Sequence, residues 1–249
     1  MNQSEQYHFN DFTSENYGKL IRLAKKNYVF RNFHNFNENE KFVIWRHDID
    51  ISLHRSLALA KIEAEEKVQA TYFVLLHSEF YNLLEKENTD LLIDIRNLGH
   101  EIGLHFDAHY YNIQNESDLE FYLRFEKEFL EKLFQIEVKS FSFHITNAFT
   151  MSCQKEKYAD MLNVYASYFQ DEVGYCSDSN GYWRFRRLED VLSQAQDTRL
   201  QVLTHPSLWQ DVAMSPRQRV LRCVEGRAKK TMQWHDQTLQ KYGRENIDE

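Results

Sequence analysis

Residues that bend or break a chain are scarce here: the 249 residues include only seven glycines and two prolines. No stretch is rich in proline, glycine or serine, and no internal repeat is present, so the sequence offers no linker. A hydrophobic share of 42% is enough for a real core and excludes wholesale disorder. We therefore expect one domain over residues 1–249.

Long apolar runs and cysteine pairs are also missing. No window holds roughly 18 uncharged apolar residues, so no membrane span is expected. The segment Met1–Gln6 is polar and acidic, without the basic start and apolar run of a signal peptide. Cys153, Cys176 and Cys223 are widely spaced and odd in number, which favours reduced thiols. These features predict a soluble, cytoplasmic protein.

The sequence has no excess of positive charge: its net charge is −8. We expect no nucleic-acid partner, since proteins that bind phosphate backbones usually present a basic face. Basic residues gather near the C-terminus, where residues 212–249 are predicted to form a charged helix packed on the domain. The alternatives for this helix are homodimerisation and attraction to an anionic lipid-linked substrate. Residues 1–40 are predicted to form an N-terminal helical extension.

Apolar runs alternate with amphipathic helical segments through the rest of the chain. One helix is expected to begin at the capping residue Ser52, and another is expected to stop at Gly99. This alternation predicts an α/β fold, a barrel or partial barrel of about seven parallel strands with helices outside it. The expected strands are Phe42–Trp45, Ala70–Leu76, Glu101–His105, Val138–Phe143, Met161–Ala166, Tyr182–Phe185 and Leu200–Thr204.

Polar clusters follow the ends of these strands, where the chemistry of such folds gathers. Asp48 and Asp50 point to the same side of an extended segment. Two carboxylates in one site repel each other, so a cation is expected nearby, with one carboxylate as its ligand and the other as a base. The alternative is a pair of helix-capping or salt-bridged aspartates. His47 would lie on the opposite side of the strand.

A second cluster contains His105 and His109, four residues apart. On one helical turn they would share a face and could hold one metal ion. The alternative is two unrelated histidines. His205, after the last strand, is a candidate general acid, or else an ordinary surface histidine. Further candidates for binding substrate or supporting the site are Arg46, His144, Asp178, Trp183 and Arg184; the alternative for the last three is a capped turn with a core tryptophan.

Taken together, these residues favour amide hydrolysis. Two histidines and one carboxylate leave open positions on a divalent metal ion, with zinc expected first and cobalt, nickel or manganese as alternatives. Such an ion polarises a carbonyl and acidifies water. A carboxylate can then take a proton while a histidine protonates the leaving amine.

The order of these motifs resembles the polysaccharide deacetylase family, the NodB-homology or carbohydrate esterase family 4 group, from about Phe42 to Pro206. The resemblance implies a distorted (β/α)7 barrel and a single catalytic domain that removes N-acetyl groups from sugars. It also implies Asp48 as base and His205, within Leu203-Thr204-His205, as acid. The implied metal ligands are Asp50, His105 and His109.

The first motif departs from the family pattern because Ile49 separates the two aspartates, so the roles of base and ligand could be exchanged. The third motif lacks its usual arginine, for which Arg46, Arg184 or His144 are the candidate substitutes. The Ser177–Trp183 stretch resembles the fourth motif, which lines the pocket and supports the acid.

The His-Asp-x-Asp variant is similar to members associated with O-antigen and other surface polysaccharides. The leading hypothesis is therefore a metal-dependent de-N-acetylase in lipopolysaccharide or capsule-like biosynthesis. Its substrate would be an N-acetylated sugar, free or linked to a nucleotide or lipid. Deformylation or another amide hydrolysis is a close variant. The rival is a non-catalytic glycan-binding or scaffold protein on a degenerate barrel.

Overall fold

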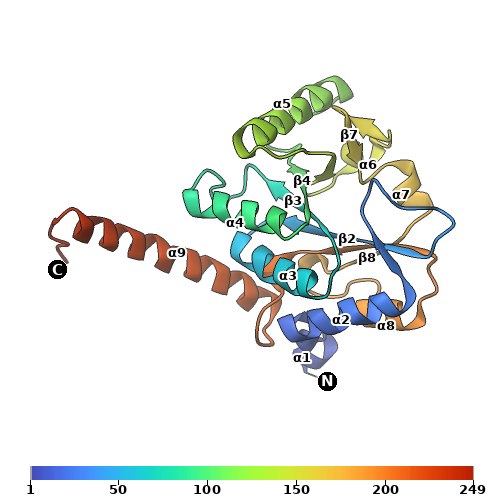
Figure 1. The fold of residues 1–249 in the computed structure, drawn as a ribbon, viewed down its shortest axis with the longest axis horizontal. Coiled ribbons are helices and arrows are strands. Elements are labelled where there is room, and N and C mark those ends of the chain that lie inside the picture. Colours follow the sequence, from blue (N-terminus) through green and yellow to red (C-terminus); the bar gives the residue numbers. More distant parts are fainter. Residues whose placement is uncertain (1, 249) are drawn as a thin grey trace.

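The computed structural model describes residues 2–248 and is built around a nine-stranded sheet with helices packed against it (Figure 1). The strands are β1 (Val29–Arg31), β2 (Phe42–Ile49), β3 (Thr71–Leu75), β4 (Glu101–Phe106), β5 (Ser140–Phe143), β6 (Lys157–Tyr158), β7 (Met161–Asn163), β8 (Gly174–Ser177) and β9 (Arg199–Thr204). The α-helices are α1 (Gln3–Gln6), α2 (Ser14–Asn27), α3 (Leu53–Glu65), α4 (Lys86–Asn97), α5 (Glu116–Phe134), α6 (Ala148–Ser152), α7 (Ser167–Asp171), α8 (Leu188–Gln194) and α9 (Pro216–Lys241). Three short 3-10 helices are η1 (Phe9–Phe12), η2 (Ser179–Gly181) and η3 (Pro206–Leu208).

Eight of the strands run parallel, and seven of them follow one another in the spatial order β7-β5-β4-β3-β2-β9-β8. Read as a ring, this order follows the chain, and within residues 2–248 the ring is open only between β7 and β8. The short β1 adds to the first half of β2, and β6 forms an antiparallel pair with β7. The predicted α/β fold with a distorted seven-stranded barrel is therefore confirmed.

Alternate residues of β2 face opposite sides of the sheet. Ile44 packs into a small apolar cluster on the inner side of the barrel, and Arg46 and Asp48 continue that side. His47 lies on the other side, beneath the helices, where its Nε2 is 2.6 Å from a carboxylate oxygen of Glu63. The alternation thus carries one aspartate of the first motif into the barrel and keeps His47 out of it.

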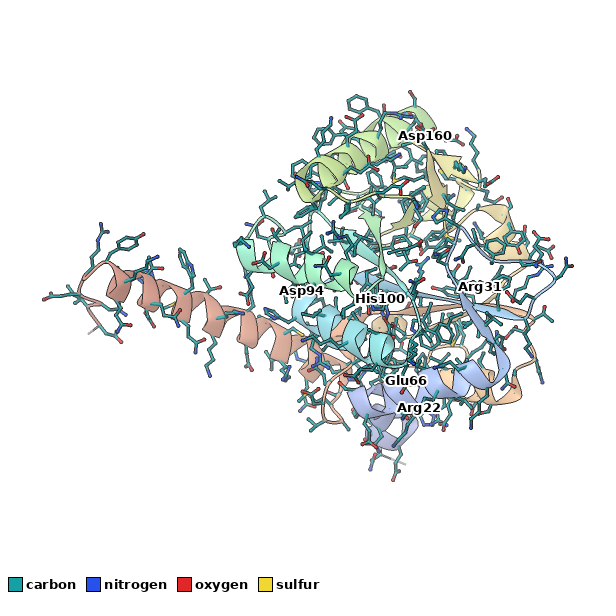
Figure 2. The ribbon with its side chains drawn as sticks, in the orientation of Figure 1. Arg22, Arg31, Glu66, Asp94, His100 and Asp160 are labelled. Carbon is teal, nitrogen blue, oxygen red and sulfur yellow. The ribbon has the colours of Figure 1, made fainter. Side chains whose placement is uncertain are left out.

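Polar contacts fix the helices against the sheet. The His100 imidazole at the start of β4 donates from Nε2 to the carbonyl oxygen of Ala60 in α3, over 2.9 Å. Arg22 of α2 and Glu66 at the end of α3 form an ion pair of 2.5 Å. Arg22, Glu66 and His100 are labelled in Figure 2, where side chains fill the space between helices and sheet.

One expected strand is wrong. Residues 182–185 form no strand, and the strand in this part of the chain is β8, eight residues earlier. The backbone of Asn180 (φ 67°) and Gly181 (φ 80°) turns in the left-handed region and redirects the chain. Beyond this turn the Phe185 side chain is 86% exposed, so the aromatic run belongs to a loop.

The two ends of the chain differ in how they meet the barrel. The N-terminal segment is integrated: Thr13 forms a parallel bridge with Gln210 beside η3. The first half of α9 is tied to the body, for example by an ion pair of Arg227 with Glu85. Its second half projects away from the body (Figure 1). No helix in residues 2–248 is both long and apolar enough to cross a membrane.

Candidate metal-dependent active site

A cavity of about 990 Å³ opens at the C-terminal ends of the parallel strands. Its carboxylates and imidazoles come from the ends of four of them: Asp48 and Asp50 from the end of β2, His105 from β4, His144 from the residue after β5, and His205 from the residue after β9. These residues lie far apart in the sequence, and the barrel brings them to one edge as the sequence predicted.

Three of them form a cluster that fits a metal ion. Asp50 Oδ1 lies 3.2 Å from His105 Nε2 and 3.5 Å from His144 Nδ1, and the two nitrogens are 3.1 Å apart. Asp50 Oδ1 is buried and, among the described residues, accepts no hydrogen bond. Burial alone raises the pKa of Asp50, but the two imidazoles outweigh it and lower that pKa far below its usual value. A carboxylate with two imidazole nitrogens is a donor set for a divalent transition-metal ion.

His109, the second histidine of the expected ligand pair, is not part of this cluster. The expected helical turn does not form: β4 ends at Phe106, and the chain then enters a tight turn with Asn112 at φ 52°. His109 is exposed, and its Nε2 lies 2.8 Å from the carbonyl oxygen of Ile145. The structure thus places His144 where the sequence analysis expected His109, and His109 supports the loop that carries His144.

Ser142 orients His105. Its hydroxyl lies 2.7 Å from His105 Nδ1 and can donate to Asp48 Oδ1 at 3.4 Å. With Nδ1–H donating to this hydroxyl, the lone pair of Nε2 points toward Asp50 and His144. Such an outer partner fixes both the tautomer and the ring orientation of a ligating histidine.

Asp48 is paired with the buried Arg46 on the same strand. Arg46 Nη2 donates to Asp48 Oδ2 over 3.0 Å and to the Tyr165 hydroxyl over 3.1 Å. Burial lowers the pKa of Arg46, but Asp48 and Tyr165 more than offset this, so its pKa is raised and it remains a cation. Among the three substitutes considered for the missing third-motif arginine, Arg46 is the one that contacts Asp48 with a guanidinium.

His205 is held by Asp178 from the neighbouring strand. The fully buried Asp178 carboxylate accepts hydrogen bonds from the His205 backbone N–H (3.0 Å), from His205 Nδ1 (2.7 Å) and from Trp209 Nε1 (2.8 Å). Burial lowers the pKa of His205, but the Asp178 charge outweighs it and raises that pKa to about 9. His205 Nε2 forms no hydrogen bond within residues 2–248 and faces Asp50 Oδ2 at 3.7 Å.

The remaining two candidates, Arg184 and Trp183, differ in whether they line the cavity. Arg184 is exposed and lines the cavity. Trp183 turns away from it: its ring stacks on Phe12 at 5.0 Å between centroids, and its Nε1 donates to Asp11 over 2.8 Å. Trp183 therefore anchors the N-terminal segment and does not line the cavity.

Four residues of the cavity region were not singled out as site candidates from the sequence: Ser142, Tyr165, Gln201 and Arg217. Ser142 had a weak signal, because it is a polar residue two positions before His144 on an apolar strand. Tyr165 and Arg217 come from segments that only the folded chain brings to the cavity.

No family model matches this sequence, and no curated protein is similar to it at the level of sequence. Solved structures are similar in fold. A family 4 carbohydrate esterase from Bacillus anthracis is 19% identical, with a TM-score of 0.44 over 84% of this chain and 85% of that one. The peptidoglycan deacetylase PdaC from Bacillus subtilis is 14% identical, with a TM-score of 0.45 over 83% and 99%.

A pseudoenzyme of carbohydrate esterase family 4 from Bacillus anthracis is also 14% identical, with a TM-score of 0.42 over 78% of this chain and 63% of that one. The solved structures to which the chain is similar are carbohydrate esterase family 4 proteins, the group that its sequence motifs resemble.

Proposed function

We propose that this chain is a metal-dependent hydrolase that removes the N-acetyl group from a sugar. The observation that carries the proposal is the convergence of Asp50, His105 and His144 in one cavity, flanked by Asp48 and His205. A metal cluster alone is compatible with many activities. A carboxylate on one side of it and a histidine held by a buried carboxylate on the other are the parts that amide hydrolysis needs.

In this proposal Asp50, His105 and His144 hold the ion, which supplies Lewis acidity to the amide carbonyl and to water. Asp48 accepts the proton of the attacking water, and Arg46 keeps its carboxylate in place. Protonated His205 donates from Nε2 to the leaving nitrogen, so the C–N bond breaks to give acetate and an amine. Asp178 accepts a hydrogen bond from Nδ1 and so fixes the orientation of the imidazole ring that donates this proton.

The finer assignment is a cytoplasmic enzyme of surface-polysaccharide synthesis that uses zinc and acts on a precursor sugar. It is supported by the His-Asp-x-Asp motif of residues 47–50, which is similar to that of O-antigen cluster members. Deformylation is the nearest variant, because the same residues can hydrolyse a formamide. A panel of N-acetylated and N-formylated sugars, free, nucleotide-linked and lipid-linked, separates these activities by the acid released.

Metal content and acetate release test the core of the proposal. Purified protein should contain about one transition-metal ion per chain, and a chelator should abolish acetate release until metal is restored. Asp48→Asn should keep the metal but lose roughly 10²–10⁴-fold in kcat, the usual contribution of a general base. Protein without transition metal, and not stabilised by adding one, contradicts the metal site.

The non-catalytic glycan-binding alternative drew its support from the missing third-motif arginine. Arg46 supplies a guanidinium to Asp48, which removes that ground for it. If wild type and Asp48→Asn both release no acetate or formate from the whole panel while sugars still bind, the glycan-binding alternative replaces our proposal.

A further inference from the structure

The solvent-exposed rim of the cavity carries unpaired positive charge. Among the described residues, the only carboxylates that line the cavity are Asp48 and Asp50 at the proposed reaction centre. Two arginines line it as well, Arg184 from the loop after η2 and Arg217 from the first turn of α9. Both side chains are exposed, and neither forms an ion pair or side-chain hydrogen bond within residues 2–248.

The neighbours of these two arginines show how unusual that is. The other arginines of the same two segments all have partners in the protein. These pairs are Arg186 with Asp197 (2.5 Å), Arg187 with Asp11 (2.7 Å), Arg219 with the Gly181 carbonyl (2.8 Å) and Arg222 with Gln210 (2.9 Å). On each segment, the one arginine that lines the cavity is the one without an ion-pair or hydrogen-bond partner among residues 2–248; the Arg184 guanidinium lies 5.2 Å from the centroid of the exposed Phe185 ring. The net charge of −8 provides many carboxylates that could have neutralised it.

The two segments are locked together, so the two guanidinium groups share a defined surface. Arg219 reaches across from α9 to the Gly181 carbonyl. Gly181 itself has φ +80° and packs so closely that a Cβ there would lie 2.9 Å from Cβ of Pro216. Arg184 follows Gly181 by three residues and Arg217 follows Pro216 by one, which anchors both at the same rim.

We propose that Arg184 and Arg217 form an anion-binding subsite for the phosphate groups of a sugar linked through a diphosphate to its carrier. The inference rests on the proposed function and names its substrate class. Guanidinium groups bind phosphate oxygens through paired hydrogen bonds. The cavity of about 990 Å³ lies at the upper end of the roughly 300–1,000 Å³ typical of ligand sites, which leaves room beyond one sugar ring.

The test compares a charged and a neutral ligand on metal-loaded full-length protein. Calorimetric titrations measure binding of uridine diphosphate N-acetylglucosamine and of neutral di-N-acetylchitobiose to wild type, Arg184→Gln, Arg217→Gln and the double variant. Each single change should lower the ratio of the two affinities about tenfold, since one charge-assisted hydrogen bond has this order of strength. High salt should lower the wild-type ratio in the same direction.

The matched control is Arg244→Gln. Arg244 is likewise exposed, and it lies beyond the end of α9 and does not line the cavity. This variant should leave both affinities unchanged. An unchanged ratio in the double variant overturns the subsite, whatever the wild-type protein hydrolyses.

Hydrolysis assays keep this inference separate from the proposed function. A ratio that falls in the arginine variants, with no acid released from any substrate, supports the subsite and contradicts the hydrolase. If the protein hydrolyses neutral glycan, and the ratio of the two affinities is the same in wild type and in the arginine variants, the result supports the hydrolase and contradicts the subsite. A third ligand, N-acetylglucosaminyl diphosphate farnesol in detergent micelles, distinguishes a lipid carrier from a nucleotide carrier by its kcat/KM.

Discussion

Single residues divide the work of the site, and the metal ligands are the first point to test. His144→Ala should weaken zinc binding by more than the roughly 10–100-fold that changes to outer partners of metal ligands cost. His109→Ala removes only a contact to the Ile145 carbonyl and should weaken it less than about tenfold. Titration of metal-free protein with Zn²⁺ or Co²⁺ measures both constants. The reverse ranking would return His109 to the ligand set that the sequence suggested.

The pH dependence of the reaction tests the proton donor. His205 is protonated below its pKa of about 9, so activity that needs this proton should persist in mildly alkaline solution and fall as the pH rises through 9. Asp178→Asn removes the charge that raises this pKa. The alkaline limb of kcat should therefore move toward the usual histidine value of about 6.5.

The measurement is a kcat profile for both proteins, with thermal unfolding to check that Asp178→Asn remains folded. A limb that stays in place in a folded variant would mean that another group donates the proton.

The placement of a residue could be predicted from the sequence where it depends only on the neighbouring residues of the same strand. The alternation of β2 fixed the opposite directions of His47 and Asp48, because side-chain direction in a strand depends on nothing beyond the strand. The placement of His144, and not His109, beside Asp50 and His105 was not foreseeable, because it depends on a turn after β4 and on the loop after β5. His144 had been named, but only as a supporting residue.

Among the elements, β4 packs closely against its neighbours β3 and β5 because it has a glycine, Gly103, at the point of contact. A Cβ on Gly103 would lie 2.5 Å from the Phe73 ring of β3 and 3.0 Å from the Ser140 carbonyl of β5. The Phe73 ring cannot move freely, because it is fully buried and the Arg46 guanidinium lies 5.6 Å from its centroid. Gly103→Ala should therefore lower the free energy of unfolding by about 1–3 kcal/mol, the range for an overpacked core.

The matched control is Gly226→Ala in α9, where an added Cβ meets nothing within 4 Å. It should leave stability unchanged or raise it by up to about 1 kcal/mol through helix propensity. Urea unfolding of both variants gives the comparison. Equal effects of the two substitutions would contradict the close packing of β4.

Element boundaries followed from the sequence where capping and burial agree. Ser52 caps α3 through a hydrogen bond from the Arg55 backbone N–H, and Gly99 follows the end of α4 with φ +97°. The expected strand at residues 182–185 was wrong because aromatic residues suit a strand and a loop anchor equally. Only the contact of Trp183 with Phe12 and Asp11 distinguishes them.

For the whole molecule, the outer half of α9 is separable from the barrel. Within residues 2–248, the last side-chain contact of α9 itself with the body is that of Lys230, which pairs with Glu87. Removal of residues 233–249 should therefore change the melting temperature by less than about 2 °C, because no buried contact is lost. Metal content should stay the same. Calorimetry and metal analysis of the truncated chain measure both.

Size-exclusion chromatography of the same two proteins examines the dimerisation alternative for this helix. We expect the same oligomeric state before and after truncation. A wild-type dimer that becomes a monomer would assign the outer part of α9, where the exposed Trp234 lies, to self-association.

The overall architecture was foreseeable because strand–helix alternation dictates a parallel sheet, and seven strands of this length dictate a ring. The opening between β7 and β8 was not. It reflects short strands at both borders and the side chains of Tyr165, Phe169 and Tyr175, which line the cavity in that region. Tertiary packing of this kind leaves no periodic trace in a sequence.

The pairing of Arg46 with Asp48 has a consequence for how this protein can vary. Both residues belong to one strand, two positions apart, so the geometry of that strand alone sets their relative placement. If the arginine came from a separate loop, any insertion or deletion between that loop and the base could move the two apart. In this chain the loop after β5 carries the proposed ligand His144 but not the counter-ion of Asp48, so a change of loop length beyond His144 leaves the Arg46–Asp48 pair in place.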